Sequence, residues 1–356
     1  MAVFSVSEIK EKIQKFPKQD LIHLPTPFQK LENLTQKLAG PNIYIKRDDL
    51  TGLAFGGNKS RKLEFIIQDV LNKKADVIIT WAGLQSNWCL QTAAAARKFG
   101  ITPILVLFNI YDLPAEYDGN LLLDFILGAE IKIKEAEKGG VVHLESVDQV
   151  LEETATKVKE RGHIPYVAPI GGSAVGGSMQ QPLGAISYVN AFVELVEQAE
   201  SRGFDVDYVI HASGSGGTQA GLAVGAKALS EKTKVLGMSV SEEKKTYREL
   251  VLDIARDTTK ALNVELEVGE GDIVIFDAYL GEGYGEVNKD VAETIRLVAI
   301  REGIFLDPVY TGKAMVGLID LVKKGYFRRD DNIVFYHTGG TAALFPNKHK
   351  LGKFLS

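Results

Sequence analysis

The sequence is short of cysteine: its 356 residues contain one, Cys89. A single cysteine excludes a disulfide within the chain, so we expect a reducing compartment and a cytoplasmic location. Long apolar runs are also missing, and no segment approaches the length of a membrane span. The first residues, Met1 to Lys15, carry spread charges and no apolar centre, so we expect no signal peptide.

An excess of positive charge is likewise absent. The formal net charge is −5, and the basic residues form only short pieces such as Lys348-His349-Lys350. A binder of nucleic-acid phosphates would present a basic patch, so nucleic acid is not an expected partner. We find no internal repeat and no low-complexity tract, and we predict no metal site.

What is present is the composition of an ordinary globular protein, with 45% hydrophobic and 24% charged residues. The chain is long enough for two compact lobes. From residue 76 onward, apolar strand-like runs alternate with helical patterns, which predicts an α/β fold with parallel, doubly wound sheets. The Gly-rich segment 171–184 breaks this rhythm, and we interpret it as the crossing between the lobes.

The predicted elements follow from hydrophobic periodicity and turn signals. Strands are expected at 42–46, 76–81, 102–108, 131–133, 166–170, 208–212, 235–240, 272–276 and 333–337. Helices are expected after the capping box Ser5–Glu8, at 31–39, and at about 88–99, 120–127, 147–161, 186–202, 219–229, 244–262, 288–303 and 314–324.

The stretch Gly56-Gly57-Asn58-Lys59 lies between the strand 42–46 and a helical run of apolar residues. Two glycines allow a flat ligand to approach closely, and the N–H groups of a helix start favour anions. We expect the helix start, together with Arg61 and Lys62, to lower the pKa of Lys59, as a Schiff-base nucleophile requires. Taken alone, the fragment fits an ordinary helix start better.

The loop 213–218 also follows a strand and opens a helix. Its glycines let backbone N–H groups converge, as a phosphate requires. It has no Walker lysine, and Gln219 stands where a dinucleotide motif has glycine, so a cofactor with one phosphate fits best. The alternative is a plain Gly-rich turn.

Four further polar stretches lie at predicted strand ends or in loops. They are Gln85-Ser86-Asn87, the two tyrosine segments 281–285 and 307–313, and Thr338-Gly339-Gly340-Thr341. Each has an ordinary reading as a helix cap, packing aromatic or turn. Ligands of open α/β sheets bind outside the carboxyl ends of the strands, so the joint occurrence is more specific than any one stretch.

These motifs, in this order, resemble the D-cysteine desulfhydrase and 1-aminocyclopropane-1-carboxylate deaminase family. The resemblance rests on Gly-Gly-Asn-Lys-Ser-Arg-Lys-Leu-Glu, Gln-Ser-Asn, Gly-Ser-Gly-Gly-Thr-Gln-Ala-Gly, Asp-Pro-Val-Tyr-x-Gly-Lys and His-x-Gly-Gly, and it spans about residues 20–347. It implies a pyridoxal 5'-phosphate enzyme of the tryptophan-synthase-β fold type (fold type II). It also implies a large cofactor-binding domain from 1–58 and 177–356, a small domain from 59–176, and a homodimer.

The resemblance implies roles for individual residues. Lys59 matches the Schiff-base lysine. The catalytic residues would be Lys59, Ser86, Tyr284 and Tyr310. The cofactor would be held by Lys59, Asn58, Asn87 (at the ring hydroxyl), the phosphate cup of Ser215, Gly216, Gly217 and Thr218, and Thr338 near the pyridine nitrogen. A small amino-acid substrate would contact Ser86 (at its carboxylate), Asn87, Trp88, Tyr284, Tyr310 and Thr311.

Two positions separate the members of the family. Deaminases typically have Glu after the Asp-Pro-Val-Tyr tyrosine and Leu after the last-strand histidine, and this chain has Thr311 and Thr338. Without a carboxylate the pyridine nitrogen is a weaker electron sink, which suffices for β-elimination with release of pyruvate and ammonia. This favours D-cysteine desulfhydrase-like activity.

Two departures from the family leave the substrate open. Trp88-Cys89-Leu90 replaces a small or polar pair and Arg, and residues 174–182 look partly inserted. L-cysteate sulfo-lyase-like elimination therefore remains an alternative, as does ring-opening deamination. A binding protein that has kept the fold and lost catalysis is disfavoured by Lys59, Tyr284 and Tyr310.

Overall fold

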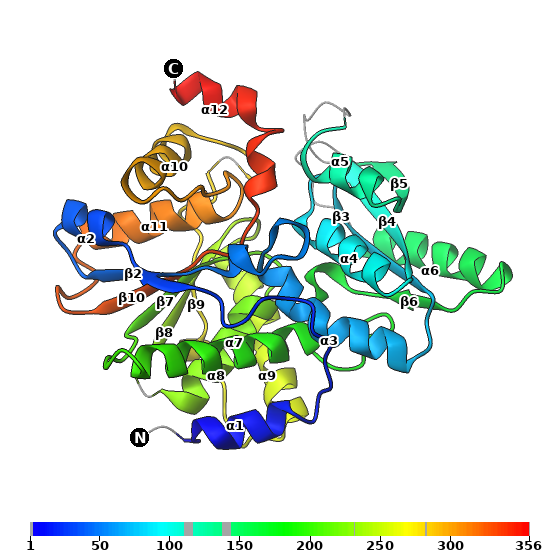
Figure 1. The fold of residues 1–356 in the computed structure, drawn as a ribbon, viewed down its shortest axis with the longest axis horizontal. Coiled ribbons are helices and arrows are strands. Elements are labelled where there is room, and N and C mark those ends of the chain that lie inside the picture. The colour runs from blue at the N-terminus through cyan, green and yellow to red at the C-terminus, as the bar shows by residue number, and fades with distance from the viewer. Residues whose placement is uncertain (1–2, 110–116, 137–143, 231, 282, 356) are drawn as a thin grey trace.

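The computed structural model describes residues 3–109, 117–136, 144–230, 232–281 and 283–355. Its strands form two sheets (Figure 1). The larger has six strands in the order β1-β2-β10-β7-β8-β9, and the smaller has four in the order β5-β4-β3-β6. The antiparallel pairing of β1 with β2 is the exception to an otherwise parallel arrangement. The expected α/β class with mostly parallel sheets is confirmed.

The elements have the following bounds. The strands are β1 Phe28–Lys30, β2 Asn42–Lys46, β3 Val77–Gly83, β4 Thr102–Asn109, β5 Glu130–Glu135, β6 Pro165–Val167, β7 Tyr208–Ser213, β8 Lys234–Ser239, β9 Val274–Phe276 and β10 Asn332–Tyr336. The α-helices are α1 Val6–Ile13, α2 Glu32–Leu38, α3 Asn58–Asn72, α4 Asn87–Lys98, α5 Gly119–Ile126, α6 Leu144–Glu160, α7 Leu183–Glu200, α8 Gly217–Leu229, α9 Lys244–Leu262, α10 Lys289–Glu302, α11 Thr311–Lys323 and α12 Lys348–Leu355.

The six-stranded sheet is covered on both faces. Helices α7, α8 and α9 lie below it in Figure 1, and α10 and α11 lie above it. The central strand β10 is a continuous apolar run, and Ile333, Val334 and Phe335 are fully buried. Such runs are typical of parallel strands with helices on both faces.

The strands of the four-stranded sheet lie within residues 77–167. Helices α4 and α5 cover one side of this sheet, and α6 runs along the other (Figure 1). Helix α3 packs against both α4 and α7, so it connects the two sheets. Its buried face consists of Leu63, Ile66, Ile67 and Val70, each fully buried. The predicted domain bounds, 1–58 with 177–356 and 59–176, agree in outline with this division of strands and stay a prediction.

The structure differs from the sequence-based prediction in several elements. The edge strand β1 and the terminal helix α12 were not predicted. Helices α6, α7 and α11 each begin three residues earlier than predicted, at Leu144, Leu183 and Thr311, and β6 ends at Val167 rather than at residue 170. No helix in the described part of the chain is long and apolar enough to cross a membrane. The described residues also contain no group of three or more His, Cys, Asp or Glu side chains placed to hold a metal ion.

Candidate active site

The turn that carries Lys59 lies against the end of β10. Gly57 pairs with Gly339 in an isolated bridge, and the backbone N–H of Asn58 donates to the Thr338 carbonyl at 3.0 Å. Gly57 has φ 135°, and a Cβ there would lie 2.7 Å from the Gln91 amide nitrogen. Glycine is therefore required for this close approach, as the sequence indicated.

The same turn contacts the predicted phosphate cup and helix α4. Asn58 Nδ2 donates to Thr218 Oγ1 at 3.1 Å, in the first turn of α8. Gln91 of α4 donates to the Gly56 carbonyl at 3.1 Å and accepts from Ser60 Oγ at 2.7 Å. The structure thus brings together the Lys59, 213–218 and 338–341 stretches, which lie far apart in sequence.

Lys59 is the second residue of α3, and its side chain is half-buried. Burial lowers the pKa of Lys59 to about 8. The predicted direction is confirmed, and its main cause is burial rather than the charges of Arg61 and Lys62. No acceptor among the described residues lies within hydrogen-bond distance of Lys59 Nζ, so the amine is available to a ligand.

The cup at the start of α8 is built for an anion. Gly216 has φ 84°, a left-handed conformation suited to glycine, and the helix begins immediately after it at Gly217. The N–H groups of the first helical turn have no partner within the helix. Ser215 and Ser173 hydroxyls lie 2.9 Å apart beside them. A phosphate group suits this arrangement of N–H groups and helix dipole.

Lys62 is a second lysine near the cup, which sequence analysis treated only as a neighbour of Lys59. It is fully buried, and its Nζ donates to the Gly171 carbonyl at 2.9 Å and to Ser173 Oγ at 3.1 Å. Burial, and then the charge of Lys59, hold the pKa of Lys62 well below its ordinary value. Its spacing of three from Lys59, on one face of a helix, was the available signal.

Tyr284 and Tyr310 form a pair. Their hydroxyls are hydrogen-bonded to each other, and their rings meet edge to face with centroids 5.8 Å apart. Burial, together with Tyr284, raises the pKa of Tyr310 well above its ordinary value. Tyr310 therefore stays a neutral phenol at physiological pH. Glu282, in the same loop as Tyr284, lies outside the described residues.

The Tyr310 segment is fastened by Asp307, which is fully buried. Its two carboxylate oxygens accept four hydrogen bonds, from the backbone N–H groups of residues 309–311 and from Thr311 Oγ1 at 2.6 Å. Thr311 was predicted at the substrate, and in the structure its hydroxyl is used inside this turn. Lys313 continues the fastening by donating to the carbonyls of Leu280 and Gly283 in the Tyr284 loop, at 2.6 and 2.7 Å.

Ser86 caps α4, because its Oγ accepts the Cys89 N–H at 3.1 Å. A capping serine keeps its own O–H free to donate, so the cap and the predicted carboxylate contact are compatible. Trp88, predicted at the substrate, is 3% exposed and donates its Nε1–H to Thr80 Oγ1 at 2.7 Å. Its indole packs beside Gly172, and its N–H is used in a hydrogen bond within the core.

The segment 174–182 is tied to the smaller sheet. Ser178 donates its N–H to the Val167 carbonyl and accepts the Val167 N–H through its hydroxyl, at 2.8 and 2.9 Å. Lys73, directly after α3, donates to the Ser178 carbonyl at 2.7 Å. These contacts anchor the segment to β6 and α3.

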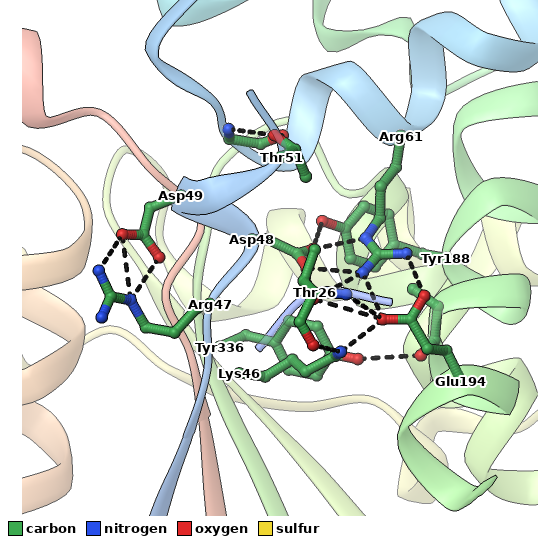
Figure 2. Close-up of polar contacts among 12 residues, drawn as sticks. Thr26, Lys46, Arg47, Asp48, Asp49, Thr51, Arg61, Tyr188, Glu194 and Tyr336 are labelled. Carbon is green, nitrogen blue, oxygen red and sulfur yellow. Dashed lines mark hydrogen bonds and ion pairs between the residues drawn. The ribbon is translucent and has the colours of Figure 1, made fainter. Parts of the chain in front are cut away.

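A buried ionic cluster, which sequence analysis did not predict, supports the Lys59 turn (Figure 2). The Arg61 guanidinium lies between two carboxylates: it donates to Asp48 at 2.8 and 2.9 Å and to Glu194 of α7 at 2.9 and 3.1 Å. Tyr188 donates to Asp48 at 2.6 Å, and Lys46 pairs with Glu194. Arg61 is 2% exposed and Asp48 is fully buried.

The cluster contains two basic side chains, Arg61 and Lys46, and two carboxylates, Asp48 and Glu194. Burial alone would raise the pKa of Glu194, but Arg61 and Lys46 lower it to about 2, so Glu194 stays ionised. Asp48 also accepts the Gly57 N–H through its backbone carbonyl at 2.9 Å. Asp48 therefore holds the Lys59 turn on both sides, at Gly57 through the backbone and at Arg61 through the side chain.

Comparison with known proteins identifies the family of this chain. Residues 20–339 match the family described as pyridoxal-phosphate dependent enzyme. The chain belongs to that family. The cofactor of this pyridoxal-phosphate enzyme is pyridoxal 5'-phosphate, and its fold is that of the tryptophan-synthase-β type.

Relatives narrow the group within the family. The enzyme is 41% identical to a Serratia proteamaculans protein named D-cysteine desulfhydrase, over 95% of this chain and 98% of that one. It is also 41% identical to a Pyrococcus furiosus protein provisionally named 1-aminocyclopropane-1-carboxylate deaminase, over 98% and 99% of the two chains. A crystal structure titled as an ACC deaminase homologue superposes with a TM-score of 0.87 at 38% identity, covering 98% and 99%.

The residues of this enzyme fit the cofactor. A half-buried amine with a pKa of about 8 faces no protein acceptor among the described residues, as covalent attachment of an aldehyde requires. The α8 cup supplies N–H groups and hydroxyls for a phosphate, and Asn58 connects the cup to the lysine turn. The Lys59 turn, the α8 cup and the Thr338–Gly340 loop would together hold the cofactor.

Proposed function

We propose that this enzyme is a lyase that eliminates a β-substituent from a small amino acid, with D-cysteine as the best candidate substrate. The overall reaction would convert D-cysteine and water to pyruvate, ammonia and hydrogen sulfide. The bond between Cβ and sulfur breaks, the α-proton is lost, and the resulting aminoacrylate is hydrolysed.

The observation that carries this proposal is the absence of an available carboxylate among the described residues at the end of β10. Thr338, a hydroxyl residue, stands where the ring nitrogen is expected. The nearby carboxylates are engaged: Asp307 by four donors of its own turn, Asp48 by Arg61, and Asp49 by Arg47 at 2.7 Å. A ring nitrogen without a carboxylate partner withdraws electrons less strongly, which favours loss of a good β-leaving group over ring opening.

The bound cofactor would supply an electron sink for the bonds at Cα. The chain's residues would do the rest. Lys59 holds the cofactor and, when released, moves the α-proton, since an amine with a pKa of about 8 exchanges protons readily near neutral pH. Ser86 and the free N–H groups at the start of α4 bind the substrate carboxylate.

The tyrosine pair would serve the leaving group. Because burial raises the pKa of Tyr310, this phenol keeps its proton, and its hydrogen bond with Tyr284 fixes the position of the pair. A neutral phenol would stabilise a departing thiolate by donating a hydrogen bond to it.

Ring-opening deamination is the second candidate. It is favoured by the names of the Pyrococcus furiosus relative and of the superposed crystal structure. Elimination of sulfite from L-cysteate is a variant of the first candidate, because it needs the same elimination chemistry with a different leaving group.

The test is a panel of D- and L-alanines with different β-substituents, scored for pyruvate with the purified enzyme. We expect D-cysteine to give pyruvate and sulfide in equal amounts. Production of 2-oxobutyrate from 1-aminocyclopropane-1-carboxylate, with no pyruvate from any member of the panel, would overturn the proposal.

Lys59→Ala is the matched control for this panel. The variant should lose the absorbance band near the edge of the visible range, and turnover should fall by roughly a thousandfold or more, as expected for loss of a covalent catalyst. An unchanged band and unchanged turnover would remove Lys59 from its proposed role.

We further propose that the enzyme is a cytoplasmic homodimer. The single cysteine supports the reducing compartment, and the family resemblance supports the dimer. Light scattering on the purified protein should give twice the chain mass of 38.9 kDa. A mass of one chain would contradict the dimer.

A further inference from the structure

Asn120, in the first turn of α5, touches a predicted cofactor residue. It is fully buried, and its Nδ2 donates to two oxygens: the Gln85 backbone carbonyl at 2.9 Å and Asn87 Oδ1 at 2.8 Å. No sequence motif pointed to Asn120, which lies 33 residues from Asn87. The contact joins the start of α5 to the start of α4.

The orientation of the Asn120 amide is fixed by backbone. A backbone carbonyl only accepts hydrogen bonds, so the Asn120 atom facing Gln85 O must be the nitrogen. The Asn120 backbone N–H is held as well, because it donates to Gln85 Oε1 at 2.8 Å, while Gln85 Nε2 donates to the Asp118 carbonyl at 3.0 Å. Every amide in this chain of contacts has one orientation that satisfies its neighbours.

Asn120 in turn fixes the amide of Asn87. Since Asn120 presents a donor, the Asn87 atom that faces it must be Oδ1. Asn87 Nδ2 then points the other way, toward the strand-end loop, where a Cβ on Gly340 would lie 3.0 Å from it. Within the described parts of the chain, Nδ2 donates to no protein atom, and Asn87 is half-buried.

We infer that Asn120 is a positioning residue: it orients Asn87 so that Asn87 can only donate to the ring oxygen of the cofactor. This inference rests on the proposed cofactor role of Asn87. A donor to an oxygen favours its ionised form, whereas an acceptor facing it disfavours that form. The amide orientation of Asn87 therefore sets the balance between the ionised and protonated ring oxygen.

Absorbance reports this balance without any turnover. The band near the visible edge belongs to bound cofactor with an ionised ring oxygen, and the near-ultraviolet band belongs to the protonated form. Asn120→Asp replaces the donor by an acceptor, so Asn87 would turn its Nδ2 toward residue 120 and its Oδ1 toward the ring. The ratio of visible-edge to near-ultraviolet absorbance should fall about tenfold or more, the factor that one hydrogen bond to an ionised group is worth.

A double-mutant cycle with Asn87→Ala separates this role from a general disturbance. If Asn120 acts through Asn87, then Asn120→Asp should change the band ratio in the natural background and have no further effect when residue 87 is alanine. If Asn120→Asp changed the band ratio equally with asparagine and with alanine at residue 87, its effect would not pass through Asn87, and the inference would be overturned. An effect of the added charge alone would give this result. If Asn120→Asp does not fold, Asn120→Ala enters the same cycle, with a smaller fall expected.

Asn42→Asp is the matched control. Asn42 Nδ2 donates to Asn332 Oδ1 at 3.2 Å, and both residues lie at the N-terminal ends of their strands, β2 and β10, whereas the site lies at the C-terminal ends. Asn42→Asp therefore makes the same chemical change in an amide pair away from the site. Its band ratio should equal that of the unchanged protein, and a fall as large as that of Asn120→Asp would overturn the inference.

Failure of the inference is distinguishable from failure of the proposed function. If the natural protein shows no visible-edge band after incubation with pyridoxal phosphate, the proposed cofactor chemistry fails. If the band is present and Asn87→Ala leaves its ratio unchanged, the cofactor chemistry stands and the orienting role falls.

Discussion

At the scale of single residues, the site depends on an amine kept reactive by its surroundings. Lys59 is half-buried, has no hydrogen-bond acceptor among the described residues, and has a pKa of about 8 because burial disfavours its charged form. An ordinary lysine, with a pKa of about 10.4, would be almost wholly protonated at neutral pH. The lowered value leaves a useful fraction of neutral amine.

The pH dependence of cofactor capture follows from this shift. Below pH 8 the amine is protonated and cannot attack an aldehyde, so the rate of covalent capture by the cofactor-free protein should rise about tenfold per pH unit and level off above pH 8. Stopped-flow absorbance measures this rate. A rate that still climbs steeply between pH 9 and pH 10 would mean that the lysine has its ordinary pKa.

At the scale of elements, α3 is held in place by charge. Arg61 is clamped between Asp48, which follows β2, and Glu194 of α7, and Figure 2 shows the guanidinium between the two carboxylates. The next residue of the helix, Lys62, donates to Gly171 and Ser173. Helix α3 therefore presents Lys59 from a fixed position between both sheets.

Removing the Arg61 charge should be costly. Arg61→Met leaves the buried carboxylate of Asp48 without its cation and Glu194 with Lys46 alone, which we expect to lower the free energy of unfolding by about 3–5 kcal/mol. Arg61→Lys keeps the charge but loses the two-pronged contact with Asp48, so its loss should be smaller. Urea denaturation measures both.

The control for this prediction is Lys289→Met on α10, whose ion pair with Glu293 is exposed on both sides. Its effect should be within about 1 kcal/mol. If Arg61→Met were no more destabilising than Lys289→Met, the cluster would not hold α3 as described.

Lys313 plays a similar part between α11 and the Tyr284 loop. Lys313→Met removes the hydrogen bonds to the carbonyls of Leu280 and Gly283. The Tyr284 loop then loses its anchor, and Tyr284 is no longer held in place against Tyr310. We expect kcat to fall about tenfold or more, with a loss of about 1–3 kcal/mol in the free energy of unfolding. Steady-state kinetics and urea denaturation measure the two effects.

Lys324→Met, just beyond the end of α11, is the comparison for Lys313→Met, because Lys324 is exposed where it pairs with Asp320. It should leave kcat unchanged. An unchanged kcat in Lys313→Met would show that the contacts of Lys313 with the Tyr284 loop do not affect the function of the tyrosines.

At the scale of the whole molecule, the site lies where segments distant in sequence meet. Strand β2 from the N-terminal part pairs with β10 from the C-terminal part, and this pairing places the Lys59 turn against Thr338. The parallel strands, the Lys59 turn and the Gly-rich cup were predictable because each has a local signal: an apolar run, two glycines, or a strand followed by a helix start.

Other features depend on contacts that local patterns do not carry. The edge strand β1 has three residues and follows Pro27, so it gives no periodicity. Asp48, Arg61 and Glu194 form their cluster across separations of 13 and 133 residues. The indole N–H of Trp88 donates a hydrogen bond to Thr80 in the smaller sheet. The direction of this side chain depends on packing rather than on its neighbours in sequence.

The central claim is that this pyridoxal-phosphate enzyme eliminates a β-substituent rather than opening a ring. The most direct test is to measure kcat/KM for D-cysteine and for 1-aminocyclopropane-1-carboxylate with one preparation, scoring pyruvate and 2-oxobutyrate separately. We predict a preference for D-cysteine of at least about a hundredfold, because the engaged carboxylates leave the ring nitrogen to Thr338. A higher kcat/KM for the cyclopropane substrate would contradict the account.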